Sequence, residues 1–259
     1  MDVHFITLQR VAALTCLEQN PPVRITPLLL AAACTTVQAR TVAIDVGHYR
    51  EEPGVISARG RTEFEFNREL ALEIRSAADG SGLKTTLIGA DGLTARLARR
   101  TAAAAGADFF LSVHHDSMQP QFLQTWEYEG ASRRFSELQS GFSLFVSRKN
   151  AAPGRSLACA SAIGAEMRTA GFAPSLYHAD PIPGESKPFA DRANGVHYYD
   201  NLVVLKSARM PALLLEAGVI VNRDEEVRMR SAETQQRIAA AVARGLERCL
   251  RRVGARPPG

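Results

Sequence analysis

Two histidines and two glutamates stand at positions where strands end or helices begin, and together they have the chemistry to hydrolyse an amide. His48 follows the apolar stretch "TVAIDVG", and His114 closes "FFLSVH". Glu63 opens a helical pattern, and Glu216 follows three leucines. Two imidazoles and one carboxylate with an open fourth position are the ligands of a catalytic zinc ion. A further carboxylate that does not bind the metal would act as the general base.

Each of these residues taken alone also has a structural explanation. His48 in a Gly-His turn can bond to loop backbone, and Glu63 is an acid favoured by the dipole at a helix start. Residues 114 and 115 are both histidines, so on a strand they face opposite sides and one of them at most points into a site. Glu216 is the most informative, because an acid after a buried strand needs a partner or a function. The four residues together indicate a catalytic metal site far more specifically than any one of them does.

The elements that must position these residues alternate between strands and helices. This pattern predicts an α/β fold, a single domain with a mixed, mostly parallel sheet flanked by helices on both faces. In such folds ligands bind at the carboxyl ends of the strands, where His48, His114 and Glu216 fall. The expected strands are 41–46, 83–88, 108–115, 141–147, 201–206 and 211–218, and the expected helices are 62–79, 94–105, 155–170 and 231–250.

Two segments, 118–140 and 174–200, lack a clear helix or strand pattern. They are expected to hold most of the irregular structure. The second is rich in proline and glycine and resembles a long surface loop, and long loops in small domains are often functional. It contains His178 and His197. We expect both to be exposed loop histidines rather than substrate contacts.

Composition limits the classes of protein that remain. The 259 residues are 46% hydrophobic and 22% charged, which excludes a disordered or collagen-like chain. The net charge is +4, and the basic residues are scattered, so no nucleic-acid partner is expected. No apolar stretch reaches the roughly 18–20 residues of a membrane helix, so no stable membrane span is expected.

The motifs around the candidate residues resemble a known family. They are "AIDVGH", then Glu63 with Asn67 four residues later, then "LSVHHDS" and "LLLEAGVIVN". Together they resemble the zinc-dependent N-acetylmuramoyl-L-alanine amidases of the cell wall (amidase type 3), over about residues 41–250. The resemblance implies that His48, Glu63 and His114 bind Zn2+, and it selects His114 over His115. It also implies that Glu216, with Asn222 after it, is the catalytic base.

That resemblance implies a peptidoglycan hydrolase. Zinc-activated water would cleave the amide bond between N-acetylmuramic acid and L-alanine of the stem peptide, and a protein activator is a possible further partner. Asp45 would either orient one of the metal ligands through a hydrogen bond or have a structural role in the turn before His48. Two alternatives stay open: a zinc peptidase or deacylase acting on another wall amide, and a non-catalytic wall-binding regulator on the same scaffold. Segment 174–200 matches no pattern of the family.

The N-terminus suggests export. Residues 23–39 combine a basic residue, a short apolar core and a Val-Gln-Ala ending, so residues 1–39 are expected to be a signal peptide with an upstream segment. Lipidation at Cys34, or no export, are the alternatives. Residues 40–252 would be the zinc amidase catalytic domain in the periplasm or cell envelope, and 253–259 a short tail. Cys159 and Cys249 remain after cleavage, either as a disulfide or as two free thiols.

Overall fold

A mixed seven-stranded sheet organises residues 39–252, the part of the chain that the computed structural model describes. Nearly all of the expected export segment, with Cys34, and the expected tail 253–259 lie outside the described residues. The strand order is β2-β1-β3-β9-β6-β8-β7. The strands are β1 (Thr41–Val46), β2 (Lys84–Ile88), β3 (Phe109–Asp116), β6 (Ser143–Val146), β7 (Phe189–Asp191), β8 (Val196–Tyr198) and β9 (Ala212–Val219).

Parallel pairing dominates the sheet, as the sequence predicts. The pairs β2–β1, β1–β3, β3–β9 and β6–β8 are parallel, whereas β9–β6 and β8–β7 are antiparallel. Parallel strands end on the same side, so the carboxyl ends of β1, β3 and β9 lie together. The predicted mixed, mostly parallel sheet is therefore confirmed, and its edge carries the three strand-end candidates.

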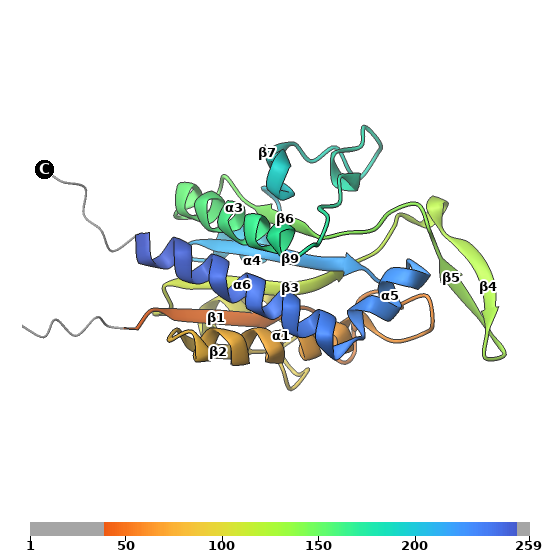
Figure 1. The fold of residues 1–259 in the computed structure, drawn as a ribbon, viewed down its shortest axis with the longest axis horizontal. Coiled ribbons are helices and arrows are strands. Elements are labelled where there is room, and N and C mark those ends of the chain that lie inside the picture. Colours follow the sequence, from red (N-terminus) through yellow and green to blue (C-terminus); the bar gives the residue numbers. More distant parts are fainter. Residues whose placement is uncertain (1–38, 253–259) are drawn as a thin grey trace, which may run out of the picture. The chain divides into compact units, whose positions relative to one another are not determined.

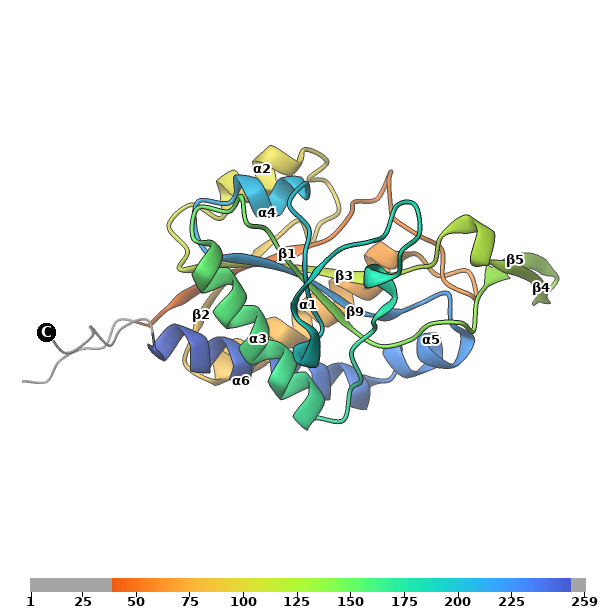
Figure 2. The ribbon, with the colours of Figure 1, turned by 90° about the horizontal axis from the view of Figure 1, so that it is seen from above.

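Helices cover both faces of the sheet, as predicted (Figure 2). On one face α1 (Glu63–Gly80), α3 (Pro153–Thr169) and α6 (Ala232–Arg252) enclose the larger core, and on the other α2 (Leu97–Ala103) and α4 (Val203–Ser207) enclose a smaller one. Alternation along β3 supplies both cores, with Leu111 on the α1 side and Phe110 on the α2 side. Short helices complete the fold: α5 (Arg223–Met229), η1 (Pro120–Phe122), η2 (Tyr177–Ala179) and η3 (Arg192–Asn194).

The predicted strand 201–206 is wrong, because residues 203–206 lie in the helix α4. Val204 and Leu205 are both buried in the smaller core, which α4 completes beside α2. A short apolar run has no period that separates a buried helical turn from a buried strand. Packing in the smaller core therefore determines that this run is helical rather than extended.

The two segments expected to be irregular contain strands. Residues 118–140 include the antiparallel hairpin β4 (Gln124–Tyr128) and β5 (Ala131–Phe135), which Figure 1 shows beyond the end of the main sheet, beside α5. Its two turn residues, Glu129 and Gly130, both have positive φ, where asparagine or aspartate before glycine is the usual signal. Residues 174–200 supply β7 and β8 to the sheet edge.

A disulfide joins Cys159 of α3 to Cys249 of α6. The sequence had left open whether these cysteines form a disulfide or two free thiols. The bond links residues separated by 90 positions. Closing so long a loop restricts the unfolded chain, and removal of a native disulfide typically costs about 2–5 kcal/mol.

The double variant Cys159→Ala/Cys249→Ala is therefore expected to unfold at a Tm lower by about 5–15 °C. Calorimetry without reductant measures the difference. Wild-type protein treated with reductant and alkylated serves as the control, and it should show a similar loss. An unchanged Tm in both would contradict this contribution.

None of the helices in the described part of the chain is long and apolar enough to cross a membrane.

Candidate metal centre and active-site groove

Three of the predicted residues come together at the carboxyl edge of the sheet. The Nε2 atom of His48 lies 3.0 Å from one carboxylate oxygen of Glu63, and the Nδ1 atom of His114 lies 2.9 Å from the other. One donor atom from each residue lies within 4.8 Å of the other two. The end of β1, the first residue of α1 and the end of β3 thus supply a compact cluster of two imidazoles and one carboxylate.

Capping of α1 does not occupy Glu63, although it is the first residue of the helix. Thr62 is the N-cap, and its side chain and that of Glu65 form a capping box. The Glu63 carboxylate is left to turn inward, where it is buried and accepts hydrogen bonds from the amide of Asn67 at 3.1 Å and from the backbone of Val55 at 3.2 Å. The sequence left two explanations for Glu63, an acid at a helix start and a residue of the site. The inward position of its carboxylate favours the second.

Glycines next to the cluster make room for its imidazole rings. A Cβ atom at Gly47 would lie 2.3 Å from the Nε2 atom of His114. At Gly54, where φ is +80°, a Cβ atom would lie 2.3 Å from Glu63 Oε2. His48 itself has a φ of 65°, so its turn is left-handed. The Gly-rich loop after β1 is therefore shaped to bring His48 over Glu63.

His114 and His115 face opposite sides of β3, as strand geometry requires. His115 is buried on the α1 side, where its Nδ1 atom donates to the side-chain oxygen of Asn67 at 2.9 Å. Since Asn67 in turn donates to Glu63, a chain of two hydrogen bonds runs from His115 to the cluster. His115 and Asn67 thus orient the Glu63 carboxylate from behind.

Electrostatics in the cluster favour an ionised Glu63. Burial raises the pKa of its carboxyl group, but hydrogen bonds and positive charge from His114 and His48 outweigh this and hold the pKa well below its usual range. Burial lowers the pKa of His48, and the bond to Glu63 more than compensates, so that pKa is raised. The cluster therefore stabilises an anionic carboxylate facing two nitrogen donors.

The donor set fits a zinc ion. Two ligand atoms that each lie about 2.0–2.1 Å from a tetrahedral zinc are about 3.3 Å apart. The 3.0 and 2.9 Å separations, each from a histidine nitrogen to a different oxygen of Glu63, are somewhat shorter, and one donor atom from each residue lies within 4.8 Å of the other two. The supporting hydrogen bond from Asn67 is also typical of metal-binding carboxylates. No other group of histidine, cysteine and acidic side chains in residues 39–252 converges in this way.

Glu216 lies beside the cluster on the neighbouring strand. It is directly opposite His114 in the β3–β9 register, so both side chains leave the sheet on the same face. Its Oε2 atom is buried and has no hydrogen-bond partner among the described residues. Burial, with the negative charges of Asp116 and Glu63, raises the pKa of Glu216 well above its usual value. Such a carboxyl group is poised to exchange a proton.

Asp45 contacts the cluster through an arginine. Its carboxylate accepts hydrogen bonds from Arg100 and Ser112, each at 2.8 Å, and both Asp45 and Arg100 are nearly fully buried. Arg100 also donates to the backbone carbonyls of Val46 and His48. The ion pair therefore holds the backbone of the His48 turn, and the side-chain hydrogen bonds of Asp45 go to Arg100 and Ser112 rather than to His48, Glu63 or His114.

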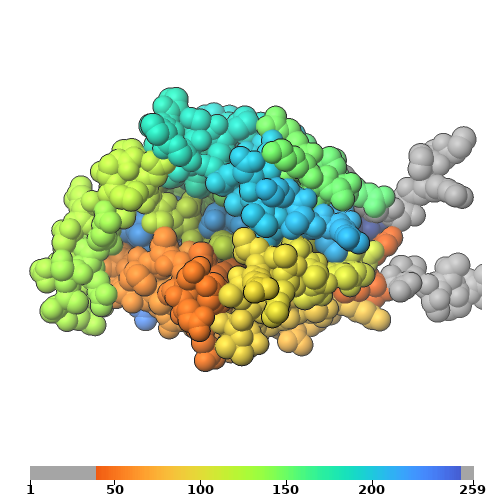
Figure 3. All heavy atoms as spheres, turned by 180° about the vertical axis from the view of Figure 1, so that it is seen from behind, coloured from red at the N-terminus to blue at the C-terminus, as the bar shows by residue number. Residues whose placement is uncertain are grey.

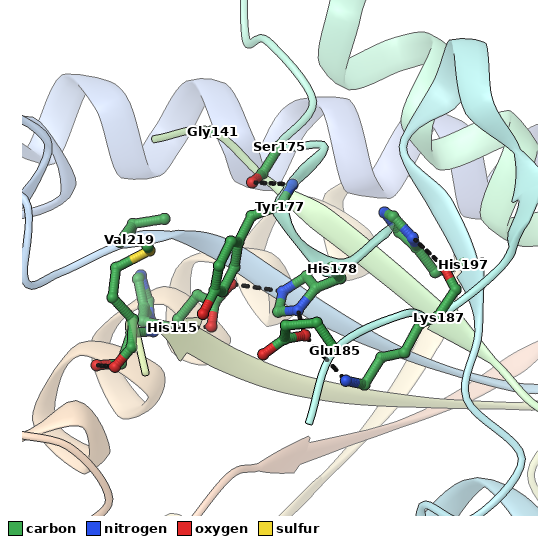
Figure 4. A network of polar contacts seen from close by, with 12 residues as sticks. His115, Gly141, Ser175, Tyr177, His178, Glu185, Lys187, His197 and Val219 are labelled. Atoms are coloured by element: carbon green, nitrogen blue, oxygen red, sulfur yellow. Dashed lines mark hydrogen bonds and ion pairs between the residues drawn. The ribbon is translucent and has the colours of Figure 1, made fainter. Parts of the chain in front are cut away.

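A segment that we call the cap, residues 174–188, lies over the ends of β3 and β9. Tyr177 and Ile182 pack there against Met118, Val219 and Val221. His178 bonds to Asp116 at 2.7 Å through Nε2 and to Glu185 at 2.9 Å through Nδ1. Figure 4 shows His178, Glu185 and Lys187 pointing toward one another.

The expectation of exposed histidines in segment 174–200 is wrong. His178 is 7% exposed and His197 is fully buried. Burial lowers the pKa of His178, but the carboxylates of Asp116 and Glu185 outweigh it and raise the pKa to about 9. Burial lowers the pKa of His197 to about 4. The cap is therefore a packed, ion-paired part of the fold, with a charged His178 at its centre.

The His178 ion pairs predict a pH-dependent stability. The folded pKa lies above the usual 6.5, so the stabilisation is full below about pH 6.5 and is lost as the pH rises through about 9. It amounts to at most about 3 kcal/mol. The Tm advantage of wild type over His178→Gln should therefore shrink between pH 6 and 9.5. A constant difference across this range would contradict the charged state of His178.

The cluster lies in a groove on the surface. Figure 3 shows a hollow between the region around α4 and the segments 49–60 and 90–103. A cavity of about 300 Å³ opens there, and His48 and His114 form part of its wall. The histidines of the cluster are thus accessible from the groove, while Glu63 is buried behind them.

Several residues around the site were missed from sequence. Arg100 is one of two arginines in α2, although an aspartate inside an apolar strand was a signal that a cation must pair with it. Asp116, His178 and Glu185 gave no signal, because nothing local joins the cap to β3. Asn222 lies away from the cluster and caps α5, where its side chain accepts from the backbone of Asp224 and Glu225.

Comparisons with known proteins agree on one family. The family model described as N-acetylmuramoyl-L-alanine amidase matches residues 42–248. The N-acetylmuramoyl-L-alanine amidase AmiA of Escherichia coli is 26% identical over 216 residues, which cover 80% of this chain and 75% of AmiA.

Solved structures show the same fold. The N-acetylmuramyl-L-alanine amidase Ami1 of Mycobacterium smegmatis superposes with a TM-score of 0.65 at 20% identity, over 82% of this chain and 97% of Ami1. The CwlD amidase of Clostridioides difficile, solved in complex with the GerS lipoprotein, gives a TM-score of 0.58 at 18% identity, over 82% of this chain and 98% of CwlD. The match spans nearly all of the described residues.

Proposed function

The chain belongs to the N-acetylmuramoyl-L-alanine amidase family, and we propose that it cleaves peptidoglycan with a zinc ion held by His48, Glu63 and His114. The bond is the amide between N-acetylmuramic acid and L-alanine of the stem peptide. The observation that carries the proposal is the convergence of three zinc-type donors beside Glu216, whose Oε2 atom is buried without a partner among residues 39–252.

A bound zinc ion would supply Lewis acidity, which polarises the amide carbonyl and lowers the pKa of water toward about 7. Glu216 then acts as base and acid in turn. With the ion bound, its positive charge would oppose the burial and the negative charges of Asp116 and Glu63 that raise the pKa of Glu216, so the Glu216 carboxylate would accept a proton from the water that attacks the lactyl carbonyl. As the carbon–nitrogen bond breaks, Glu216 passes this proton to the nitrogen of L-alanine.

The surrounding residues position these groups. Asn67 and His115 fix the orientation of Glu63 through hydrogen bonds. Arg100, paired with Asp45, holds the carbonyls of Val46 and His48 and so fixes the turn that presents the His48 ring. Removing such supporting bonds typically costs about 10–100-fold in metal affinity or activity.

We propose that the enzyme works outside the cytoplasm. Its substrate is the cell wall, and the disulfide between Cys159 and Cys249 is typical of an oxidising compartment. This placement accords with the expected signal peptide in residues 1–39. CwlD is complexed with a lipoprotein, which makes a protein activator a partner worth testing for this chain.

Digestion of isolated peptidoglycan tests the function. Purified residues 40–259 are incubated with the wall, and the soluble products are analysed by mass spectrometry. Free stem peptides that begin with L-alanine are expected. Fragments cut within the peptide would show a zinc peptidase instead, and bound zinc without any product would favour a non-catalytic wall-binding role.

A further inference from the structure

Ser143 of β6 is a fully buried serine whose hydroxyl has no hydrogen-bond partner among residues 39–252. The hydroxyls of the other buried serines in this part of the chain all have partners. These serines are Ser57, Ser112, Ser136, Ser147, Ser156 and Ser175. A buried hydroxyl without a partner is unfavourable, so the exception at Ser143 requires an explanation.

Ser143 lies directly opposite Glu216 in the antiparallel register of β6 and β9. Residues paired in this way point to the same face of the sheet, and their Cβ atoms are about 4.5–5.5 Å apart. Phe145 and Leu214, the next pair on this face, both pack in the smaller core. His114 pairs with Glu216 from the other side. His114, Glu216 and Ser143 therefore form one row across the sheet.

The Glu216 carboxylate has one enclosed oxygen. Glu216 as a whole is only partly buried, but its Oε2 atom is buried and has no partner in the described chain, like the Oγ atom of Ser143. In the structure no hydrogen bond joins these two atoms. Rotation about side-chain bonds is sufficient to form one, because a hydroxyl and a longer carboxylate side chain at paired positions are within reach of each other. Each atom can thus become the partner of the other.

The same arrangement occurs once more in this sheet, with its hydrogen bond formed. Ser112 of β3 lies opposite Asp45 of β1, and its hydroxyl donates to the Asp45 carboxylate at 2.8 Å. In both pairs a buried serine faces an acid on the adjacent strand. An ionised carboxylate only accepts hydrogen bonds, and bonds to a charged group are stronger than neutral ones. Ser143 is therefore a donor that an ionised Glu216 can use.

We propose that Ser143 is a positioning residue for the base: its hydroxyl donates to Oε2 of the ionised Glu216 and thereby holds the other oxygen, Oε1, toward the groove. Ser143 is fully buried, so it acts through Glu216 and does not touch the substrate. The role rests on the proposed function, because it requires Glu216 to be the base. Loss of the hydroxyl should therefore lower kcat without weakening substrate binding.

Two substitutions that differ by one hydroxyl test this role. Ser143→Thr keeps the hydroxyl, whereas Ser143→Val replaces it with a methyl group, and both add similar bulk. With N-acetylmuramoyl-L-Ala-D-Glu as the substrate, kcat of Ser143→Val should be about tenfold below that of Ser143→Thr, the effect of one hydrogen bond to a charged group. KM should differ by less than about twofold between the two variants.

Ser143→Ala separates positioning from a structural role. It should lose about tenfold in kcat. The Tm of its metal-free form should equal or exceed that of wild type, because the substitution removes a hydroxyl without a partner. Ser156→Ala is the matched control, since the equally buried Ser156 hydroxyl bonds to Asn150 and to the backbone of Ala212. Ser156→Ala should lower the Tm and leave kcat within about twofold.

A double variant tests whether Ser143 acts through Glu216. In the Glu216→Gln background, Ser143→Ala should lower the residual kcat by less than about twofold, because no base remains to be positioned. A crystal structure of the zinc-loaded wild type gives a result that is independent of activity. The Oγ atom of Ser143 should lie within about 3.0 Å of Glu216 Oε2.

Three results would overturn the positioning role and leave the amidase function intact. They are equal kcat values for the threonine and valine variants, a further tenfold loss on top of Glu216→Gln, and a separation above about 3.5 Å in the zinc-loaded structure. A rise in KM in place of the fall in kcat would also overturn it, since Ser143 would then affect binding. If the wild type does not cleave peptidoglycan, the proposed function itself fails and the role of Ser143 falls with it.

Discussion

The Glu216→Gln variant should fold, bind metal and lose about 10²–10⁴-fold in kcat. Glutamine keeps the shape of the side chain but cannot accept a proton. The variant should also be as stable as wild type or more so, because it replaces a buried carboxyl whose Oε2 atom has no partner among the described residues. Steady-state kinetics on N-acetylmuramoyl-L-Ala-D-Glu, metal content and a thermal melt measure these three effects.

Glu225→Gln provides the contrast for this prediction. Burial raises the pKa of Glu225 as it does that of Glu216. The Glu225 carboxylate, however, accepts hydrogen bonds from the backbone of Gly141 and Val219. Its substitution should lower the Tm and change kcat only slightly. If Glu216→Gln instead retained kcat and lost stability, Glu216 would be a structural residue and the proposed mechanism would be wrong.

The second large effect is expected from the metal ligands. His114→Ala should lose bound zinc and activity together, by a factor at least as large as that of Glu216→Gln, because both substrate polarisation and water activation depend on the ion. His48→Ala should behave in the same way. Metal content by elemental analysis, measured beside kcat, checks that the two losses coincide.

Recovery of activity in excess zinc distinguishes the loss of a metal ligand from misfolding. His115→Gln removes a supporting histidine next to His114 and should weaken zinc affinity only about 10–100-fold, so excess zinc should restore its activity. Excess zinc should restore chelator-treated wild type fully and His114→Ala hardly at all. Recovery of His114→Ala to wild-type activity would remove His114 from the ligand set.

Much of the fold followed from sequence because its signals are local. The helical spacing of Phe66, Leu70 and Ile74 places α1 within one residue of its observed bounds. The apolar runs of β1, β3 and β9 are bounded by polar or turn residues. Where an apolar run was as short as that of α4, only its packing against α2 decided its form.

The site followed from sequence to the extent that strand ends and helix starts fix positions. Parallel strands end at one edge, so His48, His114 and Glu216 had to be neighbours, and strand alternation separated the faces of His114 and His115. The contacts of His178 with Asp116 could not be read in this way. They join the cap to β3 across 62 residues, and no local pattern encodes that distance.

One zinc ion acting with Glu216 is the centre of the proposed mechanism, and a metal titration tests this pairing most directly. Zinc is added stepwise to chelator-treated protein, and release of the stem peptide from N-acetylmuramoyl-L-Ala-D-Glu is followed. Activity should rise linearly to one equivalent of zinc and then level off, and Glu216→Gln should bind one equivalent while remaining inactive. Full activity in the metal-free protein, or a Glu216→Gln variant as active as wild type, would contradict the account.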